Sequence, residues 1–134
     1  MNTALIIVSH SKLLALGVIE LVHALAGDDL AMVAVGGGDE QDSGGFGVNA
    51  SMVLEAMAEL SNADEIGMIG DVGSSFLATG AAIELEGLGG RVRMIDCPMV
   101  EGAIACAMTL SMGGSLDEAI EAGQHAWEVR KLGV

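Results

Sequence analysis

The stretch Leu5-Ile6-Ile7-Val8-Ser9-His10-Ser11, near the start of the 134-residue chain, decides the fold. Its four consecutive aliphatic residues are typical of a strand buried on both faces of a parallel sheet. Because Ser9-His10-Ser11 ends this run, His10 lies just past the carboxyl end of the strand. From residue 12 to residue 26, leucine and valine side chains recur at helical spacing until Gly27. The pattern predicts a strand, a tight turn and a helix.

The same unit recurs along the rest of the chain. Further strands are predicted at 31–35, 65–69 and 92–95, and further helices at 49–61, 75–86, 102–112 and 116–132. A glycine-rich loop is expected from Gly36 to Gly47, and Ser115 and Glu118 spell a capping box before the last helix. This order predicts an α/β fold with three α/β/α layers and a central, mostly parallel sheet of four or five strands. The even composition favours one domain over residues 1–134.

Composition restricts the partners and the compartment. With 19 acidic and 5 basic side chains, the formal charge is −14, so nucleic acid and anionic lipid are excluded as partners. Mean hydropathy is +0.56. The most apolar stretch, residues 102–112, is nevertheless far shorter than the roughly 20 residues of a membrane-spanning helix. No secretory signal is recognisable, and Cys97 and Cys106 fit buried free thiols. A cytoplasmic protein with no membrane insertion is expected.

Three short loops should converge at one edge of the predicted sheet. They are residues 9–11, 71–75 and 98–102, each of which follows a strand. In open α/β sheets, ligands bind outside the carboxyl ends of the strands, where the strand order reverses. The convergence would bring together an imidazole, a carboxylate, several hydroxyl groups and the N-termini of helices.

These groups suit transfer of a phosphoryl group through His10. A neutral imidazole can attack phosphorus with one nitrogen when an acceptor holds the other, and Asp71 is the candidate acceptor. The phosphoryl oxygens would need hydrogen-bond donors, which hydroxyl groups and helix N-termini can supply without a metal ion or another cofactor. The candidate phosphoryl-binding residues are Ser9, Ser11, Gly73, Ser74 and Ser75.

A structural interpretation of the same residues stays open. A histidine after a strand is often a turn residue bound to backbone, aspartate before glycine is common in turns, and serine commonly caps helices. His23 and His125 lie within predicted helices without a second plausible ligand, so both are expected at the surface or an interface. Trp127 is expected to dock the last helix on its neighbour or on a second subunit.

Four stretches, at residues 8–11, 45–50, 71–74 and 98–102, resemble a known family. They read Val-Ser-His-Ser, Gly-Phe-Gly-Val-Asn-Ala, Asp-Val-Gly-Ser and Pro-Met-Val-Glu-Gly. The chain is similar to mannose-type IIA subunits of the phosphotransferase system. Within that family it resembles the phosphoryl-donor subunits of phosphoenolpyruvate-dependent dihydroxyacetone kinase. The resemblance covers essentially the whole chain in order.

The resemblance implies that His10 accepts a phosphoryl group from the phosphocarrier protein HPr. His10 would then phosphorylate ADP held on the nucleotide-binding kinase subunit, and the ATP formed would phosphorylate dihydroxyacetone on a third subunit. Asp71 would orient the imidazole, and Ser11 and Ser74 would neighbour the phosphoryl group. A homodimer and a separate HPr are also implied. At the usual Gly-Thr of the second loop, this chain has Gly47 and Val48, which lacks the hydroxyl group.

Two other functions remain as alternatives. One is a sugar-transport IIA subunit that phosphorylates a IIB partner, although the stretches at 71–74 and 98–102 favour the dihydroxyacetone branch. The other is a non-enzymatic signalling or ligand-binding domain, such as a receiver-like module phosphorylated on aspartate. A receiver normally has an acidic cluster after its first strand, where this chain has Ser9-His10-Ser11.

Overall fold

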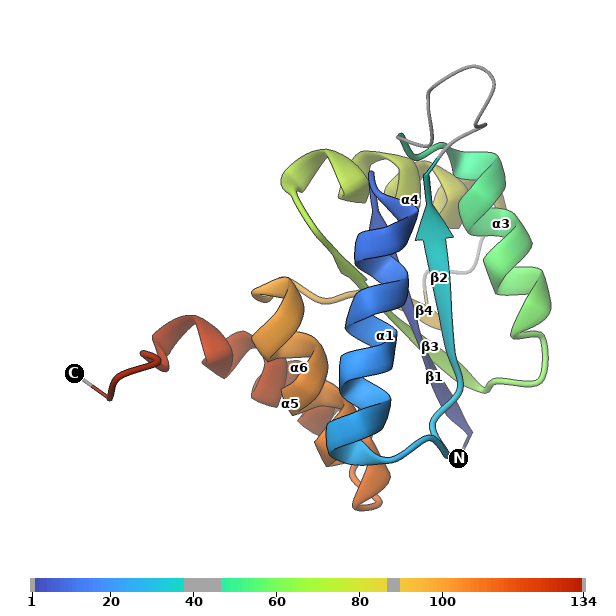
Figure 1. Ribbon diagram of the computed structural model, residues 1–134. Helices are drawn as coiled ribbons and strands as arrows, with labels where there is room; N and C mark the ends of the chain where they lie inside the picture. The colour runs from blue at the N-terminus through green and yellow to red at the C-terminus, as the bar shows by residue number, and fades with distance from the viewer. Residues whose placement is uncertain (1, 38–46, 87–89, 134) are drawn as a thin grey trace.

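The computed structural model describes residues 2–37, 47–86 and 90–133, and within them it shows a four-stranded sheet between layers of helices (Figure 1). The strands are β1 (Thr3–Ser9), β2 (Met32–Gly36), β3 (Glu65–Gly70) and β4 (Val92–Met94). They pair in parallel throughout, in the order β2-β1-β3-β4. The predicted fold class is confirmed, and each strand begins and ends within two residues of its predicted bounds.

Helices follow each strand in the described part of the chain. They are α1 (Lys12–Ala26), α3 (Ala50–Glu59), α4 (Gly73–Glu86), α5 (Met99–Ser111) and α6 (Leu116–His125), and a short 3-10 turn, η1 (Ala126–Glu128), comes last. Among these described helices, none combines the length and the apolar character needed to cross a bilayer. The glycine-rich loop predicted after β2 falls largely at 38–46, outside the described residues.

The two faces of β1 carry two separate apolar cores. Leu5 and Ile7 point into a core shared with α1, α5 and α6, whereas Ile6 and Val8 point into a second core with α3 and α4. All four side chains are almost completely buried. The alternation follows from the two-residue period of a strand, and burial on both faces explains the unbroken aliphatic run. β1 therefore separates the two cores and contributes side chains to both.

Two helix boundaries differ from the prediction by three residues or more. α5 begins at Met99 and not at residue 102, because Pro98 stands at the N-cap, where its missing N–H group costs no hydrogen bond. The last helix does not continue to residue 132: α6 ends at His125, and Val129 is already extended. Because the residues after the 3-10 turn are exposed, no apolar packing favours a longer helix. The predicted capping box of Ser115 and Glu118 is present.

The two cysteines are buried and free, as predicted. They lie where α5 and α6 pack over the sheet, and glycines make room for their sulfur atoms. A Cβ atom at Gly102 would lie 2.3 Å from the Cys97 Sγ, and one at Gly123 would lie 2.6 Å from the Cys106 Sγ. The small residues in α5 and α6 therefore permit close helix packing around the thiols.

Candidate active site

The neighbouring strands β1 and β3 bring the first and third predicted loops together. Val8 pairs with Gly70 in the register of these strands, and the amide of Asp71 donates a 3.0 Å hydrogen bond to the Val8 carbonyl oxygen. β2 lies on the other side of β1, so the strand order reverses at this point. The structure brings His10 and Asp71 together at a switch point of the sheet.

Four groups donate hydrogen bonds to the Asp71 carboxylate. The His10 amide donates to Oδ2 at 2.9 Å and the Ser9 hydroxyl donates to the same atom at 3.0 Å. The Val72 amide donates to Oδ1 at 2.8 Å, and the Ser75 hydroxyl also donates to Oδ1. Burial by itself would raise the pKa of Asp71, but these hydrogen bonds outweigh it and hold the pKa at about 2. The carboxylate is therefore ionised at neutral pH.

The ionised carboxylate determines how the His10 imidazole is protonated. Nδ1 of His10 lies 3.3 Å from each oxygen of Asp71. Because an ionised carboxylate only accepts hydrogen bonds, the neutral imidazole carries its proton on Nδ1. Nε2 then holds the free lone pair and lies 3.0 Å from the Ser74 hydroxyl oxygen. The His10 side chain is 36% exposed, whereas Asp71 is only 13% exposed. The reactive Nε2 therefore lies on the more exposed side of the pair, and the Asp71 carboxylate lies on the more buried side.

The predicted phosphoryl-binding serines occupy three different positions. Ser9 and Ser75 are buried and donate to Asp71, and Ser9 also accepts a 3.0 Å hydrogen bond from the Ser11 amide. The Ser11 hydroxyl accepts from the Leu14 amide and caps α1. Ser74 contacts the imidazole directly. The capping interpretation thus applies to Ser11, and Ser9 and Ser75 hold the carboxylate.

Two helices begin beside the imidazole. α1 starts directly after Ser11, and α4 starts at Gly73, one residue before Ser74. The first N–H groups of a helix have no partners within the helix, and that end carries a partial positive charge. α4 begins two residues earlier than predicted, which places Gly73 within its first turn. Both N-termini suit an anion near Nε2.

The second loop reaches the backbone of His10, and the segment after β4 starts a helix. The Gly47 amide donates a 2.9 Å hydrogen bond to the His10 carbonyl oxygen. Val48, at the position of the missing threonine hydroxyl, packs against the core shared with α3 and α4. The predicted loop 98–102 instead caps and starts α5, and Glu101 pairs with Lys131. Because Pro98 starts a helix, this segment is not the open loop that the sequence predicted, and its approach to His10 stays a prediction.

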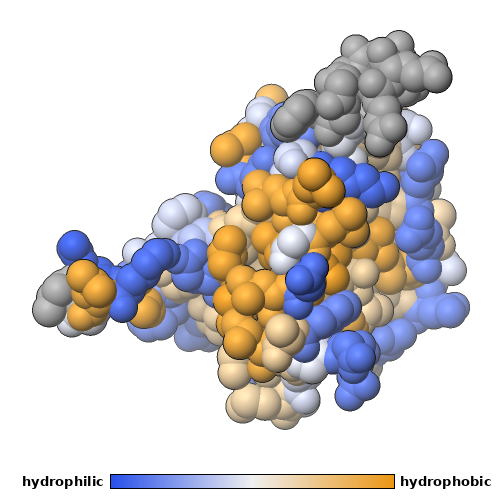
Figure 2. All heavy atoms as spheres, viewed as in Figure 1, coloured by the Kyte–Doolittle hydropathy of each residue, from blue (hydrophilic) through white to orange (hydrophobic). Residues whose placement is uncertain are grey.

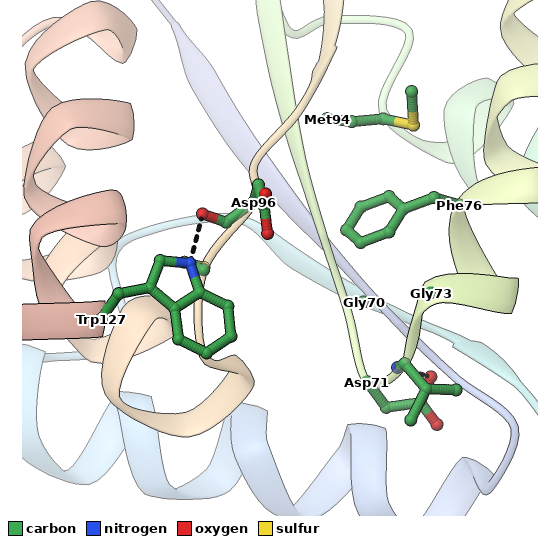
Figure 3. A pocket seen from close by; sticks show the side chains of 9 residues that line it. Gly70, Asp71, Gly73, Phe76, Met94, Asp96 and Trp127 are labelled. Atoms are coloured by element: carbon green, nitrogen blue, oxygen red, sulfur yellow. Dashed lines mark hydrogen bonds between the residues drawn. The ribbon is translucent and has the colours of Figure 1, made fainter.

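A pocket of about 590 Å³ lies between the ends of β3 and β4, next to Asp71 (Figure 3). Residues 70–73 line it together with Asp96 and Cys97. Its apolar walls are Phe76, Met94 and Trp127. Sequence reasoning missed Phe76, Met94 and Asp96, although the position of Asp96 after the fourth strand was a signal for the same sheet edge.

The remaining polar candidates lie elsewhere. His125 is exposed and pairs with Glu128 at 3.2 Å, as expected for a surface residue, and His23 is partly buried in the last turn of α1. Trp127 lies in the 3-10 turn after α6 and not in the last helix, and its Nε1 donates a 3.1 Å hydrogen bond to the Asp96 carbonyl oxygen. Within residues 2–37, 47–86 and 90–133, His, Cys, Asp and Glu side chains form no group of three suited to a metal ion.

Comparison with known proteins yields one family and several relatives. The family model described as "PTS system fructose IIA component" matches residues 4–120. The phosphoryl donor subunit DhaM of PEP-dependent dihydroxyacetone kinase from Providencia stuartii is 35% identical over 129 residues, which are 95% of this chain and 27% of that relative. The subunit DhaM of PEP-dependent dihydroxyacetone kinase 2 from Listeria innocua is 32% identical, over 78% of this chain and 83% of that relative.

A solved structure supports the fold. The phosphotransferase system component EIIA from Streptococcus agalactiae superimposes with a TM-score of 0.69 at 16% identity, covering 94% of this chain and 92% of that chain. The chain spans about a quarter of the length of the Providencia relative and most of the length of the Listeria relative.

Proposed function

Because the chain belongs to the family of PTS system fructose IIA components, we propose that it carries a phosphoryl group on His10 and donates it within a dihydroxyacetone kinase. The donor to His10 is the phosphocarrier HPr, and the acceptor is ADP bound on the nucleotide-binding kinase subunit. One observation carries the proposal: Nε2 of the partly exposed imidazole points away from Asp71, while Nδ1 is held by the ionised Asp71.

The first transfer is an in-line displacement between two histidines. The Nε2 lone pair of His10 attacks the phosphorus atom as the bond from phosphorus to the donor imidazole nitrogen breaks. The donor ring, which carries a proton on its other nitrogen, leaves with that electron pair as a neutral imidazole, so the transfer needs no net proton movement. Asp71 keeps the proton on Nδ1 and stabilises the positive charge that develops on the ring.

Hydrogen-bond donors beside Nε2 hold the phosphoryl oxygens. The Ser74 hydroxyl turns from the nitrogen to a phosphoryl oxygen, and the amides of the first turn of α4 at Gly73 and Ser74 donate alongside it. The Ser11 hydroxyl, which accepts from the Leu14 amide at the start of α1, still has its own proton to donate. Ser9 and Ser75 act through the carboxylate that they bind. These groups neutralise the charge without a metal ligand from this chain.

In the second transfer, His10 is the phosphoryl donor and its Nε2 is the leaving group. An oxygen of the terminal phosphate of ADP attacks phosphorus, the bond to Nε2 breaks, and the nitrogen regains its lone pair. ATP forms on the kinase subunit, and its terminal phosphoryl group passes to dihydroxyacetone. The four amides and hydroxyls around Asp71 stay in place, so the site returns to its starting protonation state.

The names of the relatives support the role of phosphoryl donor in a dihydroxyacetone kinase, and the description of the family model supports one alternative acceptor. Relatives from Providencia stuartii and Listeria innocua are named as its phosphoryl donor subunit. The description "PTS system fructose IIA component" favours, as second candidate, a sugar-transport subunit that phosphorylates a IIB partner. The buried free thiols suit a reducing cytoplasm.

A homodimer is part of the proposal. Figure 2 shows apolar surface over α1, and this helix carries several exposed leucines, among them Leu13, Leu16 and Leu25. Apolar surface of this kind supports contact with another protein chain. Light scattering of the purified protein should give twice the mass of one chain.

The decisive experiment is phosphorylation with phosphoenolpyruvate, enzyme I and HPr, followed by mass analysis. The wild type should gain one phosphoryl group that is lost in acid and kept in base, and His10→Ala should gain none. His125→Ala is the matched control and should be labelled normally, because His125 lies away from Asp71 on α6. Label retained by His10→Ala would overturn the proposal.

The acceptor is identified in a second step. Phosphorylated protein is mixed either with the kinase subunits and ADP or with a IIB domain. Discharge to the ADP-loaded subunit alone supports the kinase role, and discharge to the IIB domain alone supports the sugar-transport role.

A further inference from the structure

Three apolar side chains of the pocket beside Asp71 take no part in the two transfer steps. They form its walls and come from different parts of the chain: Phe76 from α4, Met94 from the end of β4 and Trp127 from the 3-10 turn after α6 (Figure 3). Such side chains are usually buried in a core. Here Met94 is 44% exposed and Trp127 is 61% exposed, so the pocket offers apolar surface to a partner.

Trp127 is held in position although it is exposed. Its indole nitrogen donates a 3.1 Å hydrogen bond to the Asp96 carbonyl oxygen, which fixes the ring against the segment after β4 (Figure 3). An ordered aromatic side chain loses little conformational freedom when a partner binds, and tryptophan is the residue type most enriched at the energetic centres of interfaces. A fixed indole on a pocket wall therefore suits an anchoring contact.

The pocket is continuous with the phosphoryl-transfer site. Residues Asp71, Val72 and Gly73 line it, and the same turn holds His10 through Asp71 and through the adjacent Ser74. Transfer between two protein imidazoles requires reacting atoms roughly 3–3.5 Å apart. The surface of a donor protein must then contact the residues that surround Nε2. When ADP is the acceptor, the nucleotide itself lies between the two proteins.

We infer that this pocket receives an apolar side chain of the protein that delivers the phosphoryl group, flanked there by lysine or arginine. The inference rests on the proposed function of His10. The apolar occupant follows from Phe76, Met94 and Trp127, and the basic flank follows from the Asp96 carboxylate at the pocket together with the formal charge of −14. Docking there positions the donor for in-line transfer and adds no chemical group to the reaction.

The test measures transfer from phosphorylated HPr over a range of HPr concentrations. Trp127→Ala and Met94→Ala should each raise the KM for HPr at least tenfold while kcat changes less than twofold, because docking is lost and the chemistry stays. Asp96→Asn should raise KM less and weaken its dependence on salt. Met112→Ala is the matched control: Met112 is 82% exposed at the end of α5, away from the pocket, and its KM should equal that of the wild type.

Two further measurements separate docking from folding and from the proposed function. Phosphoramidate, a small phosphoryl donor, labels an accessible imidazole without any protein partner, so labelling of Trp127→Ala shows that its site is intact. Wild-type KM in both pocket variants would overturn the inference, as would an effect confined to discharge onto the ADP-loaded subunit. If phosphorylated HPr failed to label the wild type, the proposed function would be wrong, and this inference with it. If the wild type were labelled and the pocket variants kept its KM for HPr, only the docking pocket would be rejected.

Discussion

At the residue scale, Asp71 differs from an ordinary turn aspartate in how completely its carboxylate is bound. Ser9, His10, Val72 and Ser75 all donate to it, from two loops that are about 60 residues apart in sequence. Those bonds keep it ionised, and the ionised form in turn keeps the proton of His10 on Nδ1. One side chain thus both joins the loops and prepares the nucleophile.

Replacing Asp71 with asparagine should separate these two roles. An amide of the same shape keeps some hydrogen bonds but cannot stabilise the charge on the ring, so the rate of transfer from HPr should fall by roughly a hundredfold. Rapid-quench labelling of the wild type and Asp71→Asn would measure it. Equal rates would show that the carboxylate does not take part.

The same variant should change how stability depends on pH. The pKa of Asp71 is about 2 in the folded protein against 3.8 normally, so the ionised carboxylate stabilises the fold above about pH 4. This stabilisation of about 2 kcal/mol is lost as the pH falls from about 4 to 2. Urea unfolding of wild type and Asp71→Asn should therefore differ most at neutral pH and converge near pH 2. A constant difference would contradict the hydrogen-bonded state of the carboxylate.

At the element scale, the end of β2 fits against the end of β1 only because residue 36 is glycine. Gly36 has a φ of +129°, and a Cβ atom there would lie 1.6 Å from the Ser9 carbonyl oxygen. Ser9 holds Asp71, so this close approach supports the site as well as the sheet. Only a residue without a side chain satisfies both demands.

Gly36→Ala should therefore destabilise the protein by about 3 kcal/mol or more and lower the yield of active site. The matched control is Gly17→Ala in the exposed middle of α1, where a Cβ would meet no atom within 4 Å. That change should be neutral or stabilising by up to about 1 kcal/mol, because alanine favours helices. Urea unfolding of both variants measures the difference, and a tolerated Gly36→Ala would show that β2 shifts easily.

Elements with a clear apolar pattern could be predicted from the sequence, and elements whose bounds depend on tertiary contacts could not. The four strands and α1 follow from local periodicity, and the capping box of Ser115 places the start of α6. The end of α6 at His125 depends on the absence of packing beyond it. In the site, His10 and Asp71 could be paired because parallel strands share an edge. The contact of Trp127 with Asp96 joins segments that no local pattern connects.

At the scale of the whole molecule, β1 couples the two cores. Leu5 and Ile7 belong to the core beneath α1, α5 and α6, and Ile6 and Val8 belong to the core beneath α3 and α4. Because one strand supplies both, neither helix layer can separate from the sheet without exposing apolar surface of β1. The protein should unfold as one unit.

Ile6→Ala tests this coupling. The substitution leaves a cavity on the α3 and α4 side and should destabilise the protein by about 2–5 kcal/mol. Hydrogen exchange measured under native conditions should then show faster exchange in α1 as well as in α3, by the same free energy. Acceleration confined to α3 would show that the two layers unfold separately.

The position of the Asp71 carboxylate between β1 and β3 also determines how the protein loses activity on storage or heating. Both groups of the reactive pair directly follow the two central strands, so fraying at the C-terminal end of a helix or at the short β4 leaves the pair assembled. Phosphoryl-carrier capacity should then decline in step with the native population and not before it. A simple labelling assay would therefore serve as a gauge of intact molecules in stored or heated stock.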